Sequence, residues 1–147
     1  MTGVRSGYLE LKELMVDVIE SGTRPRRGAR ACELDRQIRF DTAILETFSS
    51  TNWQPVVYDA LVVAAAVEFC DRSLRRSSMN WGRRFHVHIP VHDPARWSEF
   101  AVSRALVDAL NFLTGDDWHF SFRARKAQAV EPAQNRMEFP SDSEAVM

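Results

Sequence analysis

The sequence of 147 residues has little or none of several features that mark large classes of protein. It contains only two cysteines, Cys32 and Cys70, in a polar and an apolar segment, which favours reduced thiols over a disulfide framework. Its longest uninterrupted apolar run, Ala60 to Val67, is too short to cross a bilayer, and the N-terminus lacks the apolar core of a signal peptide. We therefore expect a cytoplasmic protein with no membrane partner.

Catalytic signatures are missing as well. The chain has no GxSxG elbow for a nucleophilic serine, no HExxH metal motif, and neither a Walker A nor a GxGxxG loop for phosphates. Its net charge of −1 provides no global attraction to nucleic acid. From residue chemistry alone, the sequence predicts no catalytic residue.

Two segments alternate between apolar and polar residues, as half-buried strands do. They run from Phe85 to Val91 and from Trp118 to Arg125. A period of two places the apolar side chains on one face of a sheet and the polar ones on the other. The polar side chains that we expect on one face are His86, His88, His119, Ser121 and Arg123.

One helix of about five turns is predicted between these strands. Asp93 suits the N-cap, Pro94 the first helical position and Gly115 the C-cap. Between the caps lies a stripe of apolar residues at helical spacing: Val102, Leu106, Ala109, Leu110 and Leu113. The strand, helix and strand should form a right-handed crossover if the two strands are parallel.

The other segments complete the predicted fold, which is α/β (α+β): a small two-layer sandwich of about three strands with helices on one face, plus an N-terminal helix. The N-terminal helix is expected over Ser6–Glu20, a strand over Gln37–Ala43, and a long, mostly buried helix over Val56–Arg76 with Asp59 on its solvent face. The predicted divisions are residues 1–36 (N-terminal helix and Arg-rich linker), 37–126 (one α/β domain) and 127–147 (disordered tail or linker).

The polar sheet face and the Arg-rich linker are the candidate interaction surfaces. The linker arginines favour a solvated connection over an anion-binding loop, because no aromatic residue lies between them to stack on a base. A metal-dependent enzyme using the three strand histidines is one alternative, although Asp93 is better used as a cap. An RNA-binding module is another, although the aromatic residues fall on the opposite, apolar face. The interaction candidates are Arg24, Arg26, Arg27, Arg39, His86, His88, His119 and Arg123.

Three strings carry a family resemblance: VYDALVVAAAVEFCDR, WGRRFHVHIPVHDPARW and ALNFLTGDDWHFSFRAR. Together they resemble the N-terminal domain of QueC-like proteins of bacterial anti-phage islands, which are relatives of 7-cyano-7-deazaguanine synthase. The resemblance covers about Tyr58 to Arg125, and FLTGD followed by Trp118 is its most specific part. The matching residues are Asp71, Arg72, Trp81, Asp93, Pro94, Trp97, Gly115, Asp116 and Trp118.

The resemblance implies a non-catalytic accessory domain. In the family, a downstream domain carries a Ser-Gly-Gly-x-Asp-Ser loop that binds ATP, and zinc-binding cysteines follow it. Neither feature occurs in these 147 residues, so ATP and zinc are expected only in that downstream domain. The implied partner is a QueC-like catalytic domain or its protein substrate, and we expect the chain to come from a split or truncated gene or to be an isolated domain.

Overall fold

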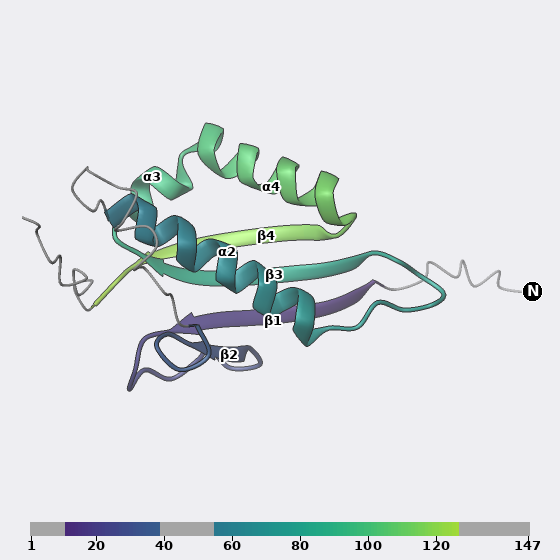
Figure 1. The fold of residues 1–147 in the computed structure, drawn as a ribbon, viewed down its shortest axis with the longest axis horizontal. Coiled ribbons are helices and arrows are strands. Elements are labelled where there is room, and N and C mark those ends of the chain that lie inside the picture. Colours follow the sequence, from purple (N-terminus) through teal and green to yellow (C-terminus); the bar gives the residue numbers. More distant parts are fainter. Residues whose placement is uncertain (1–10, 39–54, 127–147) are drawn as a thin grey trace, which may run out of the picture.

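The computed structural model describes residues 11–38 and 55–126, which form a four-stranded parallel sheet with three helices (Figure 1). The order in space is β2-β1-β3-β4, and each neighbouring pair is parallel. The predicted α/β class is confirmed, with one strand more than expected. The elements in chain order are β1 (Lys12–Ile19), β2 (Arg30–Glu33), α2 (Pro55–Ser73), β3 (Arg83–Val91), α3 (Pro94–Ser98), α4 (Phe100–Thr114) and β4 (Asp117–Ala124).

The hydrophobic core lies between one face of the sheet and the helices. Alternate residues of β3 point into it, and Phe85 pairs in register with Leu14 of β1 and Trp118 of β4. The rings of Phe85 and Trp118 stack with their centroids 4.5 Å apart. The fully or nearly buried members of this core are Val16, Val18, Cys32, Leu34, Ile38, Val62, Val63, Ala66, Cys70, Phe85, Val87, Ile89, Val91 and Trp118.

The N-terminal segment departs most from the prediction. The helix expected over Ser6–Glu20 is wrong for the described part, because Lys12–Ile19 forms β1; residues 1–10 lie outside the described part. Val16 and Val18 are fully buried, and β1 pairs with β2 on one side and β3 on the other. Leu14, Met15 and Val18 are spaced as on one face of a helix, whereas Leu14, Val16 and Val18 are spaced as on one face of a strand. Pairing inside the sheet decides between the two, since β-branched residues suit a pleated surface.

The predicted linker also contains a strand. Arg30–Glu33 forms β2 parallel to β1, and Cys32 is buried in the core rather than exposed in a polar linker. The connection from Glu20 to Ala29 is short for parallel neighbours, which usually need a longer crossover. Gly22 and Gly28 make it possible with positive φ angles of 81° and 83°. Of the strand expected over Gln37–Ala43, only Gln37 and Ile38 are described; Ile38 makes an isolated bridge with Leu34.

The predicted crossover helix is divided in two. Asp93 caps α3 as expected, its side chain accepting a hydrogen bond from the Arg96 N–H at 3.0 Å, and Gly115 closes α4 with φ 70°. Between them Glu99 has an extended backbone, with ψ 135°, so one continuous helix is not formed. None of the α4 residues is fully buried, and Leu113, expected in the apolar stripe, is exposed.

Helix α2 is less buried than predicted. Five of its 19 residues are buried, against six of nine in β3, so the central strand is the more enclosed element. Asp59, expected on the solvent face, is fully buried. Within the described ranges no helix combines the length and apolarity needed to cross a membrane.

A buried ion pair holds α2, β3 and the turn before β4 together. Arg83 is 2% exposed and donates from Nε and Nη2 to the two oxygens of Asp116, at 3.2 and 2.7 Å. It also donates to Asp71 at 2.6 Å, and Arg76 donates to both oxygens of Asp116 at 2.9 Å. Burial alone would raise the pKa of Asp116, but the hydrogen bonds and charge of Arg83, joined by Arg76, outweigh it and hold that pKa below its ordinary value.

We predict that Asp116→Asn destabilises the fold by about 3–5 kcal/mol, because it leaves the buried Arg83 guanidinium without its main counter-charge. Urea denaturation at neutral pH measures the change. Asp108→Asn, which breaks the exposed pair with Arg104, is the matched control and should cost no more than about 0.5 kcal/mol.

The same pair sets a pH dependence with a defined sign. The pKa of Asp116 is lower in the folded protein than its ordinary value of 3.8. The ionised carboxylate therefore stabilises the fold fully when the pH is above 3.8, and this stabilisation is lost as the pH falls through the pKa of the folded state. The Asp116→Asn variant should lose this part of the acid dependence. An unchanged acid profile would contradict the assignment.

Candidate functional site

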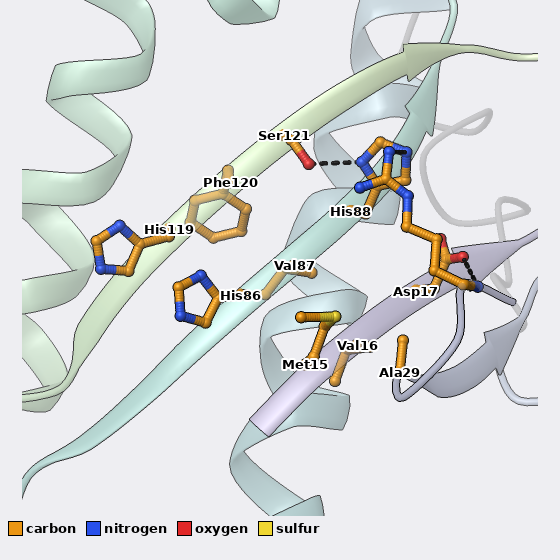
Figure 2. Close-up of a pocket in the computed structure, with 11 residues that line it drawn as sticks. Met15, Val16, Asp17, Ala29, His86, Val87, His88, His119, Phe120 and Ser121 are labelled. Carbon is orange, nitrogen blue, oxygen red and sulfur yellow. Dashed lines mark hydrogen bonds between the residues drawn. The ribbon is translucent and has the colours of Figure 1, made fainter. Parts of the chain in front are cut away.

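The face of the sheet opposite the helices carries the polar residues. In register across the sheet, Met15 lies beside His86 and His86 beside His119, while Asp17 lies beside His88 and His88 beside Ser121. Figure 2 shows these side chains around a cavity of about 290 Å³. We call this surface the open face and define it by Met15, Asp17, Arg26, His86, His88, His119, Ser121 and Arg123.

Two histidines stack at one end of the open face. The imidazole rings of His86 and His119 are nearly parallel, with centroids 4.8 Å apart. Each has its own carboxylate: His86 Nε2 lies 2.5 Å from Glu13 Oε1, and His119 Nε2 lies 3.0 Å from Asp117 Oδ1. The carboxylates fix both rings in place, so the pair presents a flat, partly exposed surface.

A chain of hydrogen bonds crosses the other end. Arg26 Nη2 lies 3.0 Å from His88 Nε2, and His88 Nδ1 lies 2.5 Å from Ser121 Oγ. A guanidinium can only donate, so His88 Nε2 must accept and the ring must carry its hydrogen on Nδ1. His88 therefore donates to Ser121, and the Ser121 hydroxyl hydrogen is left to bond another group.

This tautomer also limits the chemistry of the open face. In this arrangement His88 cannot remove the proton from Ser121, because it is already the donor in that hydrogen bond. Burial, followed by the positive charges of Arg26 and Arg123, holds the pKa of His88 below its ordinary value of 6.5. At neutral pH the ring is therefore uncharged, and the geometry suits binding rather than nucleophilic catalysis.

Asp17 organises the surrounding charges. Its side chain is almost completely buried and accepts from Arg123 Nη1 and from the Arg26 backbone N–H, both at 2.8 Å. Arg123 also donates to the Val18 carbonyl at 2.7 Å. Asp17 therefore fixes both the arginine of β4 and the loop between β1 and β2, which brings Arg26 over the sheet.

The structure brings together most of the predicted interaction residues. His86, His88, His119, Ser121 and Arg123 share one face as expected, and Arg26 joins them from the loop. Arg24 and Arg27 are exposed in the same loop and line no part of the cavity, and Arg39 lies outside the described residues. Met15 and Asp17 were not predicted to lie on this face. Their alternation with Val16 and Val18, which is typical of a strand, is the sequence signal that could have identified them.

The alternatives to binding find little support among the described residues. These residues contain no group of three or more His, Cys, Asp or Glu side chains arranged to hold a metal ion. Burial raises the pKa of both Cys32 and Cys70 to about 12, so neither thiol is an activated nucleophile. The aromatic residues Phe85, Trp118 and Phe120 point to the helix-covered side, away from the face where an RNA base would stack.

The residues that carry the family resemblance have structural roles. Asp71 and Asp116 both bind Arg83, Trp118 is in the core, and Gly115 ends α4. Arg72 pairs with Glu68 on the surface, and Asp93 with Pro94 starts α3. Trp97 packs on Phe122, and Trp81 lies under the guanidinium of Arg76 while remaining largely exposed. These contacts show how the positions support the fold, and none of them forms a reaction site.

No protein-family model, curated protein or solved structure matches this chain. Function is therefore inferred from the geometry of the described residues, together with the sequence resemblance to QueC-like proteins.

The tautomer of His88 can be tested by its titration. We predict that nitrogen NMR finds the hydrogen on Nδ1 at neutral pH and that the ring titrates below 6.5. Arg26→Gln should move this pKa towards the ordinary value by removing a positive charge, whereas Arg24→Gln, in the same loop, should leave it unchanged. Because the unfolded chain binds this proton more readily, protonation of His88 should destabilise the fold as the pH falls below 6.5.

Proposed function

We propose that this chain is a non-catalytic docking domain that binds a protein partner through the open face. The observation that supports this is a parallel sheet that the helices of the described residues cover on only one side. Parallel sheets are normally covered on both faces, because their crossover helices lie there. Here Met15 is 45% exposed in the middle of the uncovered face, between β2 and β3, and His119 and Ser121 are exposed beside it. The partner supplies the missing second layer.

The chemistry of the open face suits such an interface. Two of its charged groups, Arg123 and Asp17, are already paired, so a partner need not neutralise them when it excludes water. The paired side chains are also held in one conformation, which lowers the entropy that binding must overcome. Met15 and the stacked imidazoles provide the apolar and flat contact area, while Arg26 and the Ser121 hydroxyl provide donors.

The sequence resemblance suggests which partner docks. It points to the ATP-pyrophosphatase domain of a QueC-like anti-phage protein or to the protein substrate of that domain. In this proposal ATP and zinc bind the partner, and the chain described here acts in the cytoplasm as the accessory domain. No catalytic role is assigned to its own residues.

Met15→Arg provides the direct test. It places a long charged side chain at the centre of the open face and should weaken binding of the full chain to a purified QueC-like ATP-pyrophosphatase domain at least about tenfold. Calorimetry measures the affinity. Phe112→Arg, which changes a still more exposed apolar residue on α4, is the matched control and should bind as the wild-type chain does.

Three outcomes contradict the proposal, each in a different way. Unchanged binding by Met15→Arg overturns the assignment of the open face, and loss of binding by Phe112→Arg moves the interface to α4. Failure of the wild-type chain to bind overturns the assignment of the partner. Charge reversal at Arg123 is a poorer probe, since it would place a carboxylate beside Asp17 and destabilise the sheet itself.

A further inference from the structure

We infer that a second binding site, for an oxyanion such as a phosphate or carboxylate group, lies at the carboxyl ends of β3 and β4. Four buried side-chain nitrogens in the described ranges have no hydrogen-bond partner: His92 Nε2, Trp97 Nε1, Arg125 Nε and Arg125 Nη1. They belong to three residues, which follow β3, lie on α3 and follow β4. Figure 1 shows the start of α2, helix α3 and the ends of these strands at one edge of the sheet.

His92 is oriented by a buried carboxylate. Asp59, from the first turns of α2, accepts from the His92 backbone N–H at 3.1 and 3.0 Å and lies 2.6 Å from His92 Nδ1. The Nδ1 hydrogen therefore points to Asp59, which leaves Nε2 on the far side of the ring. The pair holds the imidazole in one orientation with a single unused nitrogen.

Arg125 lies next to this histidine. Its backbone N–H donates to the Val91 carbonyl at 3.0 Å, which places it beside the end of β3. Its guanidinium lies 4.7 Å above the ring of Tyr58, and the same ring meets His92 edge-on at 5.7 Å. Tyr58 therefore connects Arg125 with His92, and no carboxylate of the described residues forms an ion pair with Arg125.

Three of the four unpaired atoms are donors. The arginine and tryptophan nitrogens can only donate, so each of them calls for an acceptor. A buried donor without an acceptor costs about 1–3 kcal/mol, so the unpaired donors of Arg125 and Trp97 at this end of the sheet favour a bound acceptor. An oxyanion offers several acceptor atoms, and its negative charge balances the guanidinium, whose planar fork fits such groups.

The position also suits a ligand. In open parallel sheets, ligands bind beyond the carboxyl ends of the strands. The cluster is separate from the open face, because none of its three residues lines that cavity. A ligand here therefore leaves the proposed docking surface free.

Indole NMR provides the test, because two tryptophans act as probe and reference. The full ¹⁵N-labelled chain is titrated at constant ionic strength with inorganic phosphate, pyrophosphate and acetate. Trp97 Nε1–H has no partner and should shift in a saturable way, whereas Trp118 Nε1–H already donates to Thr114 Oγ1 at 2.9 Å and should not move. Trp97→Phe assigns the signal, and the anion that saturates it at the lowest concentration identifies the ligand group.

Variants connect the binding to Arg125. Arg125→Gln should weaken the anion at least about tenfold by removing the charged donors. Arg104→Gln, which removes an exposed arginine from α4, should bind as the wild-type chain does. Arg125→Lys keeps the charge without the planar fork and should bind more weakly than the wild-type chain.

Two results would overturn the inference. One is a Trp97 indole that stays unshifted with all three anions up to about 10 mM, which would saturate a site with a Kd of 1 mM. The other is an equal loss of affinity in Arg104→Gln and Arg125→Gln, which would indicate attraction to surface charge. The wild-type titration needs no variant, so it decides the matter even if Arg125→Gln fails to fold.

Discussion

Strand β3 is bonded to β1 on one side and to β4 on the other, so the alternation of its side chains decides what both faces of the sheet present. Phe85, Val87 and Ile89 point towards the helices and are buried among them. His86 and His88 point to the opposite face. There His86 lies in register with Met15 and His119, and His88 lies in register with Ser121. The covered core and the uncovered polar face are therefore two consequences of one strand.

The segments that could be predicted from sequence are those whose local signals agree with their tertiary environment. The alternation of β3 and β4, the Asp93 cap and the Gly115 cap are all of this kind. They were sufficient to predict the α/β class and the shared face of His86, His88 and His119. The part of the open face that lies on β3 and β4 could thus be predicted, whereas Met15 and Asp17 of β1 and Arg26 of the following loop could not.

The errors arise where local patterns are ambiguous and distant pairing decides. The apolar spacing of β1 fits a helix as well as a strand, so Asp17, which holds Arg26 and Arg123, was assigned to the wrong kind of element. Asp59 looked like a solvent-facing helical residue because its partner, His92, is 33 positions away. A buried polar group is recognised from sequence only when its partner can be identified, and here the fold supplies the partner.

The place of β1 in the sheet has a consequence for the order in which the chain can fold. Its first residue, Lys12, pairs with Arg83, so β1 has only the short β2 beside it until α2 and β3 have been synthesised. A strand whose second edge has no neighbour, and whose apolar residues such as Val16 and Val18 are not yet covered, is a template for pairing with other chains. During synthesis this segment is therefore the part of the molecule most in need of protection, and the arrival of β3, rather than that of any helix, ends its exposure.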